Sequence, residues 1–179
     1  MYKPPYWFLK NYKFDQKEIN LVRDNLLNRK EELSEELTHT NSLTSFFTLN
    51  KPESIFLERY RKIVEEITQS AGIYFNTNYD FFYWLQVYED GHDHIPHHHG
   101  EVQGLQNNSI SFVHFLDVPD KKLFRFTDCN GQVFYPEEQK NGDIIYFPSW
   151  AWHQVLGNDS GQVRVAIAGN IKITRYANL

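Results

Sequence analysis

Residues 82–88 read Phe-Tyr-Trp-Leu-Gln-Val-Tyr, and at this point the hydrophobic period of the chain changes from that of a helix to that of a strand. Short apolar and aromatic runs follow, separated by turn signals such as Asn130-Gly131 and Asn141-Gly142. The predicted strands are 82–88, 111–116, 123–126, 132–135, 143–147, 153–156 and 162–168, with an eighth at 171–176 or before residue 82. Many short strands at this spacing indicate a β-sandwich or a β-barrel.

The part of the chain before these strands is predicted to be helical. Residues 1–14 carry aromatic residues and prolines without a period, and we expect them to form an irregular arm. A helix should begin at Asp15, an N-cap with Glu18 as its capping-box partner, and its apolar positions continue to Leu37. Residues 40–49 suggest a connection or a short strand.

A second helix is predicted between the start signal at Asn50 and Pro52 and its end at Gly72. Because helices come first and strands follow, the predicted fold class is α+β, and mainly β. We expect residues 1–79 to form an arm and helices that pack on a barrel, and residues 80–179 to form the barrel, within one structural domain overall.

The composition narrows the class of partner. The net charge is -5, from 18 basic and 23 acidic residues, and the basic residues form no stripe, so we expect no nucleic acid partner. No apolar run approaches the length of a membrane span and the first residues show no signal-peptide pattern, so we expect no membrane partner. The single cysteine, Cys129, excludes an internal disulfide and suits a reducing compartment, and the cytoplasm is the expected location. Nothing in the sequence indicates an oligomeric state.

Five of the eight histidines lie in one segment, Gly91-His92-Asp93-His94-Ile95-Pro96-His97-His98-His99-Gly100-Glu101. Side chains alternate along an extended chain, so His97 and His99 can face one point, and so can His99 and Glu101. Either pair would offer two metal ligands from one strand end.

A third ligand is expected from further along the chain. His153 follows the predicted strand 143–147, and Pro148 ends that strand, so the chain turns and brings His153 in at the start of the next strand. Three ligands on one face leave other positions on a metal open, as iron-dependent oxygen chemistry requires. Imidazole and carboxylate ligands suit ferrous iron.

Arg164 interrupts the apolar run 162–168, where it shares a face with small residues such as Ala166. An inward-facing arginine is costly unless it meets an anion, and a dicarboxylate bound at the metal would supply one for bidentate binding. An edge-strand arginine paired with an acid is the plainer alternative. Gln86 and Ser111 are candidates to line the same pocket, although simple polar positions are equally consistent with the pattern.

Three segments together resemble the 2-oxoglutarate/Fe(II)-dependent oxygenase superfamily. They are the histidine-rich strand end 97–101, the segment Gly142–His153 with its Phe-Pro-Ser-Trp run, and the strand Arg164–Asn170. The chain is most similar to the small prolyl-hydroxylase-like group common in phages and marine bacteria. The residues that carry this closer resemblance are Trp84, His97 to Gly100, Leu116, Pro119, Gly142 to Pro148 and Arg164 to Asn170, so that it covers residues 82–175.

The resemblance implies a double-stranded β-helix, a jelly-roll or cupin-like barrel, with N-terminal supporting helices. It implies Fe(II), with 2-oxoglutarate and O2 as co-substrates, and oxygen insertion into a C–H bond of a peptidyl or small-molecule substrate. It carries over His97 or His99, and His153, as iron ligands, and Arg164 as the binder of the distal carboxylate. Most of the superfamily uses His-x-Asp or His-x-Glu, which His99 with Glu101 fits. The pair His97 and His99 matches the smaller group better and is preferred.

Other residues of these segments have simpler expected roles. Three histidines are expected to lie in solvent or behind the metal ligands: His92 and His94, which are placed in a turn, and His98, which faces away from its neighbours. His114 is expected to be a hydrogen-bonded core residue. Trp150 and Trp152 flank the approach to the metal, and packing under the turn is preferred over stacking on a substrate. Glu101, if it is not a ligand, could orient a ligand histidine.

Two other functions stay open. The run Phe147–Val155 also resembles cupin and JmjC-type barrels, and a three-histidine site would suit a metal-dependent dioxygenase or a metal-binding barrel without 2-oxoglutarate chemistry. A jelly roll that binds a sugar or a peptide without catalysis would leave the histidines incidental. Arg164 separates the first of these from the preferred interpretation, because only 2-oxoglutarate chemistry requires it.

Overall fold

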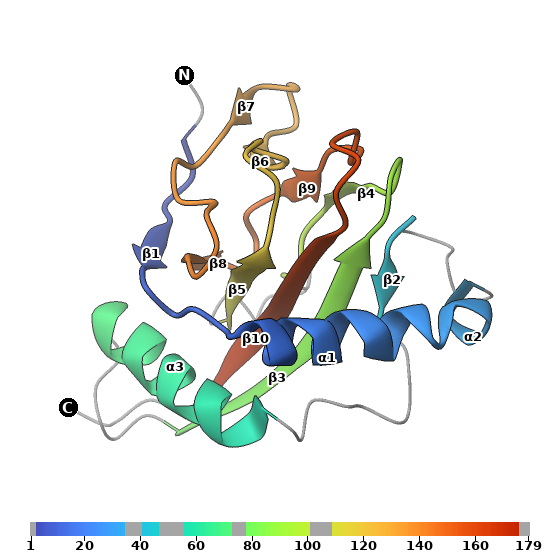
Figure 1. Ribbon diagram of the computed structural model, residues 1–179. Coiled ribbons are helices and arrows are strands. Elements are labelled where there is room, and N and C mark those ends of the chain that lie inside the picture. The colour runs from blue at the N-terminus through green and yellow to red at the C-terminus, as the bar shows by residue number, and fades with distance from the viewer. Residues whose placement is uncertain (1–2, 35–40, 47–55, 73–77, 101–108, 176–179) are drawn as a thin grey trace.

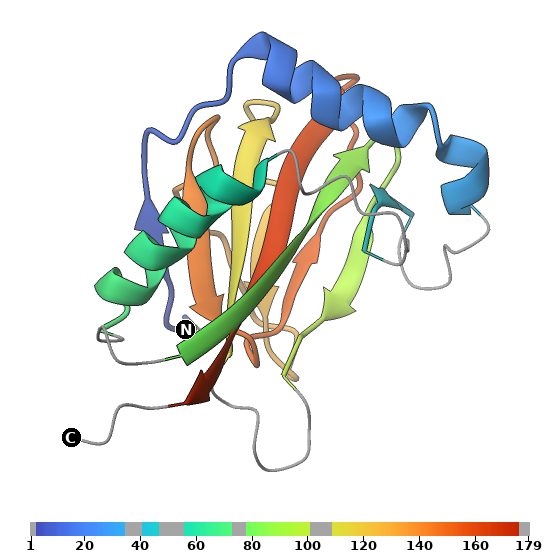
Figure 2. The same ribbon diagram turned by 90° about the horizontal axis from the view of Figure 1, so that it is seen from below.

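Two antiparallel sheets face each other, and helices cover the outer face of the larger one (Figure 1). The computed structural model describes residues 3–34, 41–46, 56–72, 78–100 and 109–175. Seen from below, α1 and α3 cross in front of the larger sheet (Figure 2). No helix in the described part of the chain is long and apolar enough to cross a membrane.

The strand order identifies the architecture. The larger sheet has the order β1 (Trp7–Leu9), β8 (Ile144–Pro148), β5 (Ser109–Asp117), β10 (Arg164–Arg175), β3 (Asn78–Tyr88) and β2 (Leu43–Thr44). The smaller sheet has the order β4 (His94–His97), β9 (His153–Val155), β6 (Phe124–Thr127) and β7 (Val133–Phe134). From β3 onward the chain alternates between the two sheets, with β6 and β7 both in the smaller one, so four strands of each sheet wind into a double-stranded β-helix. The predicted fold class is confirmed.

The first helix begins at its predicted start signal but is shorter than predicted. The first helix, α1 (Gln16–Leu27), begins at the Asp15 N-cap with the complete capping box to Glu18. It ends at the Asn28 C-cap and α2 (Lys30–Ser34) follows, so the single helix expected as far as Leu37 is divided. Asparagine is a weak helix former, which accounts for the break. Leu37 itself lies outside the described residues.

The second predicted helix is α3 (Leu57–Ser70). Its C-cap is Ala71, and the next residue is Gly72 with a φ of 77°, a left-handed conformation that glycine adopts without strain. The predicted end at Gly72 is therefore confirmed. The predicted start signal at Asn50 and Pro52 lies outside the described residues.

Both faces of the larger sheet are buried, and each packs against a different partner. Toward the helices, Ile167 and Phe112 pack in one cluster with Tyr60 of α3. Toward the smaller sheet, Ala166 packs in a second cluster that includes Phe124 of β6. Successive residues of β10 thus point to the helices and to the smaller sheet in turn.

Three strands differ from the prediction. The runs 162–168 and 171–176 are one continuous strand, β10, because the alternation continues between them. β4 lies in the segment expected to turn, since its histidines carry no apolar alternation that would reveal a strand. β1 lies in the arm expected to be irregular, and it pairs at the sheet edge with β8 over three residues. The division of the chain at residue 80 stays a prediction.

His114 is a core residue with both ring nitrogens engaged, as expected. Its Nε2 lies 2.7 Å from the carbonyl oxygen of Tyr12, which only accepts, so Nε2 carries the proton. Its Nδ1 then accepts from the Tyr60 hydroxyl at 2.8 Å. Burial lowers the pKa of His114 to about 4. The neutral ring therefore ties β5 to α3 and to the N-terminal arm.

This environment predicts acid sensitivity of the fold. An unfolded histidine titrates near pH 6.5, so the stability due to neutral His114 is present above that pH and is lost as the pH falls toward the folded pKa of about 4. The loss should reach about 3 kcal/mol. Urea unfolding of the wild type and of His114→Gln at pH 7 and pH 4.5 measures it. The amide of glutamine keeps a donor and an acceptor but does not titrate, so an equal pH dependence in both proteins would contradict the assignment.

Candidate metal centre

The structure brings His97, His99 and His153 together. β4 pairs with β9 in a register that sets His97 opposite His153, and His99 follows two residues later. The potential ligand atoms of the three rings all lie within 4.8 Å of one another. Glu101, the alternative to His97, lies outside the described residues. The three imidazoles therefore converge on one point without it.

Two of these rings are held with their Nε2 atoms free. His97 Nδ1 lies 2.8 Å from the carbonyl oxygen of Ile95, and His153 Nδ1 lies 2.9 Å from that of Ala151. A carbonyl oxygen only accepts, so each Nδ1 must carry the proton and each Nε2 must present its lone pair. This arrangement orients a metal-binding histidine and selects its tautomer.

The surroundings keep the rings uncharged. Burial lowers the pKa of His99 to about 3, and the neighbouring His97 adds to the shift. Burial also lowers the pKa of His97, and it holds the pKa of His153 well below the usual range together with the two other rings. All three are therefore neutral near pH 7. A divalent cation needs neutral imidazoles, so the donor set fits a metal such as Fe(II) or Zn(II).

Arg164 is buried in the same cavity and has no counter-ion among the described residues. The side chain is 2% exposed, and its guanidinium carbon lies 4.5 Å from the Tyr88 ring centroid and 5.6 Å from that of Phe115. Neither Nη1 nor Nη2 forms a hydrogen bond within the described part of the chain. Burial lowers the pKa of Arg164, and the Tyr88 phenol opposes that shift. β10 lies between β5 and β3, so the edge-strand position considered as an alternative for Arg164 is wrong.

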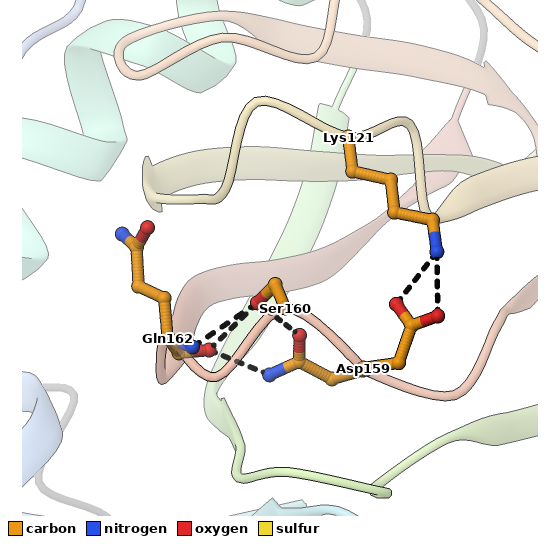
Figure 3. Close-up of polar contacts among 5 residues, drawn as sticks. Lys121, Asp159, Ser160 and Gln162 are labelled. Atoms are coloured by element: carbon orange, nitrogen blue, oxygen red, sulfur yellow. Dashed lines mark hydrogen bonds and ion pairs between the residues drawn. The ribbon is translucent and has the colours of Figure 1, made fainter.

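The turn before β10, which begins at Arg164, is anchored by the buried side chain of Asn158. The Nδ2 of Asn158 donates to the carbonyl oxygens of Tyr88 at 3.0 Å and Gln162 at 2.7 Å. The Ser160 hydroxyl donates to Asn158 Oδ1 at 2.7 Å. Figure 3 shows Ser160 against Gln162 in this turn, with the ion pair of Lys121 and Asp159 beside it. The turn thus fastens the start of β10 to the end of β3.

The three histidines, Arg164, Gln86 and Ser111 line one cavity between the sheets. The Gln86 side chain accepts a hydrogen bond from Tyr88 at 3.2 Å. The free volume is about 20 Å³, which suffices for a metal ion or a water molecule. A larger ligand therefore requires side chains in the cavity to change rotamer.

His94 lines the cavity behind His97. Its ring stacks on that of His97, with 3.9 Å between centroids and 16° between planes. Burial lowers the pKa of His94 to about 3. The expected place in a turn is wrong, because a register irregularity between His94 and His97 brings both to the cavity side.

The other histidines of the run point away from the cavity. His92 accepts a hydrogen bond from the backbone of Glu89, and the His98 ring packs edge-on against Trp152 at 4.6 Å. Trp150 and Trp152 are 45% and 44% exposed, so the expectation that they pack under the turn is wrong. Trp152 alternates with the inward-facing His153, and alternation alone predicts its outward position.

Other proteins match this chain in structure but not in sequence. No protein-family model matches the sequence, and no curated protein matches it. A prolyl-4-hydroxylase of Pseudomonas putida superposes with a TM-score of 0.66 at 16% identity, covering 95% of this chain and 93% of that one. A collagen prolyl hydroxylase of Paramecium bursaria Chlorella virus-1, solved with 2-oxoglutarate, gives 0.64 at 16% identity, over 94% and 96%. AviO1 of Streptomyces viridochromogenes gives 0.63 at 13%, over 97% and 91%. The chain shares their fold.

Proposed function

We propose that the chain is a 2-oxoglutarate- and Fe(II)-dependent dioxygenase, a hydroxylase of a peptidyl or small-molecule substrate. One observation carries the proposal: a converging histidine triad and an unpaired, buried guanidinium line the same cavity. The shared fold supports it, since the matching structures include a prolyl hydroxylase in complex with 2-oxoglutarate and a non-haem α-ketoglutarate-dependent carbocyclase.

The triad His97, His99 and His153 would hold the iron through ring nitrogens. We take His97 as a ligand rather than Glu101 because its Nδ1–H is bound to a carbonyl and its Nε2 is left for the metal. Bound Fe(II) supplies the activation of dioxygen. The protein supplies the ligand geometry. The aromatic rings of Phe124 and Phe147 pack against His153 and exclude water from the metal site.

Arg164 would bind the distal carboxylate of 2-oxoglutarate. A guanidinium out of water costs several kcal/mol unless an anion compensates it, and no described residue supplies one. Its two unpaired nitrogens match the two oxygens of a carboxylate. A dicarboxylate co-substrate would match the chemistry at both ends of the cavity, one end on the metal and the other on Arg164, once side chains in the cavity change rotamer to admit it.

A direct test mixes the purified protein with Fe(II) and 2-oxoglutarate under nitrogen. We expect a weak visible charge-transfer band that Fe(II) alone does not give, and succinate once air is admitted. Zn(II) in place of Fe(II) is the matched control and should give neither. A protein that shows no band and forms no succinate would overturn the proposal.

A second candidate is a cupin-like metal-dependent dioxygenase that uses no 2-oxoglutarate. The specific observation in its favour is the all-histidine triad, which leaves the metal without a carboxylate ligand among the described residues. The two candidates differ in what Arg164 does. Oxygen consumption that depends on the metal but not on 2-oxoglutarate would favour the second.

The setting follows from the chemistry. Ferrous iron is kept by a reducing compartment, and the only cysteine, Cys129, is exposed and unpaired. We therefore propose a cytoplasmic location. A peptidyl substrate is supported by a prolyl hydroxylase of Trichoplax adhaerens, solved with a peptide fragment, that matches with a TM-score of 0.55 at 11% identity.

A further inference from the structure

His99 is held differently from the other two rings of the triad. The rings of His97 and His153 each bond to a carbonyl oxygen two residues earlier, whereas no described residue forms a hydrogen bond with the His99 ring. Its ring packs at a tilt against Trp84, with 5.6 Å between centroids. Something other than its own ring must therefore set its position.

The backbone provides that link. The His99 N–H donates to the carbonyl oxygen of Ser149 at 2.8 Å, in the turn that follows β8. The Ser149 N–H in turn donates to the carbonyl oxygen of Ser109 at 2.9 Å. The position of His99 thus depends on where the turn holds Ser149.

The Ser149 side chain belongs to a buried group of three residues, Ser149, Ser111 and Asn170, which we call the polar cluster. The hydroxyls of Ser149 and Ser111 share a hydrogen bond of 2.9 Å, and Ser111 donates to Asn170 Oδ1 at 2.7 Å. Ser111 is the donor in both contacts, so its one proton is shared between the Ser149 hydroxyl and Asn170 Oδ1. The cluster links β10, β5 and the turn after β8.

The cluster is costly to place where it lies. Ser149 and Ser111 are each 2% exposed and Asn170 is 7% exposed; Ser111 and Asn170 lie on the paired strands β5 and β10, and Ser149 lies in the turn after β8. Buried polar groups contribute little net stability even when they are paired, and apolar residues of similar size would serve packing as well. Directional bonds do what apolar contacts do not, since they fix the turn at one distance from β10.

We propose that the polar cluster positions His99 for metal binding, an inference that rests on the proposed metal site. The three residues do not touch the metal. They hold the turn that carries the Ser149 carbonyl, and that carbonyl holds the backbone of the third ligand. Ser111, which the sequence suggested as a co-substrate contact, is on this assignment a positioning residue whose hydroxyl is already engaged.

Co(II) titration under nitrogen tests the proposal, with the visible d–d absorption as the readout of ligand geometry. Ser111→Ala should weaken Co(II) binding about tenfold and change the intensity of the absorption, as is usual when a group supporting a metal ligand is removed. Tyr146→Phe is the matched control, because it also removes a hydroxyl from this region of the sheet. That hydroxyl shares a hydrogen bond of 2.7 Å with Ser70 of α3, on the face of β8 that packs against the helices and away from the cavity. It should leave the Co(II) affinity unchanged.

A double-mutant cycle makes the test independent of simple destabilisation. Ser149→Ala should weaken Co(II) binding to a similar degree. The double variant should bind Co(II) no more weakly than the single variant with the lower affinity, because both changes break one network. Additive losses, or wild-type affinity in Ser111→Ala, would overturn the proposal. A wild type that binds no Co(II) would instead contradict the proposed function. Circular dichroism and thermal melting establish that each variant is folded.

Discussion

Alanine in place of His153 is expected to abolish metal binding and 2-oxoglutarate turnover. His153 is the most buried of the three triad histidines, and its ring packs 4.8 Å from Phe147 and 4.2 Å from His97, centroid to centroid. Its removal leaves two rings from one strand end, which form no facial set of three. Even the loss of a group that only supports a ligand costs 10–100-fold in affinity, so losing the ligand itself should cost more than about 100-fold.

Calorimetric titration with Co(II) under nitrogen measures this loss, and succinate formation measures the loss of activity. His98→Ala is the control, since it removes a histidine from the same run whose ring packs on Trp152, on the side away from the cavity. It should keep both properties. Wild-type Co(II) affinity in His153→Ala would remove the metal site from consideration.

Methionine in place of Arg164 is expected to change co-substrate affinity and stability in opposite directions. The two nitrogens that are unpaired in this structure would each form a charge-assisted bond with a carboxylate, at about 1.5–3 kcal/mol per bond. Their loss should weaken 2-oxoglutarate binding by about 100-fold or more. Without co-substrate, the variant should be more stable than the wild type by about 1–3 kcal/mol, because a buried cation without a partner is removed.

Titration of the charge-transfer band gives the affinity, and urea unfolding gives the stability. Arg125→Met is the control. Arg125 lies on β6 and donates to the Tyr135 hydroxyl at 2.9 Å, and loss of this arginine should leave 2-oxoglutarate affinity unchanged. If Arg164→Met binds 2-oxoglutarate as well as the wild type does, Arg164 is not the carboxylate site. The metal-dependent dioxygenase without 2-oxoglutarate then becomes the better interpretation.

Much of the site could be predicted because its residues alternate regularly along strands. Arg164, Ala166 and Ala168 share a face in the sequence and line the space between the sheets in the structure. His97 and His99 are two residues apart on an extended chain, and they do converge with His153.

The residues that were mispredicted depend on features that alternation does not contain. His94 and His97 are an odd number of residues apart, and only the irregular register between β4 and β9 turns both toward the cavity. The polar cluster joins β5, β10 and the turn after β8, which are far apart in the sequence, so no local pattern predicts it. The break between α1 and α2 follows from capping at Asn28 rather than from the apolar period, which continues across it.

The pairing of β4 with β9 also bears on the order in which the protein is made. The run of three histidines leaves the ribosome before His153 and before the whole of β10, so a growing chain first presents a partial chelate without its third ligand. Two histidines on an unfolded chain bind divalent metal ions without selecting among them. Specific metal loading is therefore expected to follow the insertion of β10 between β3 and β5, late in folding.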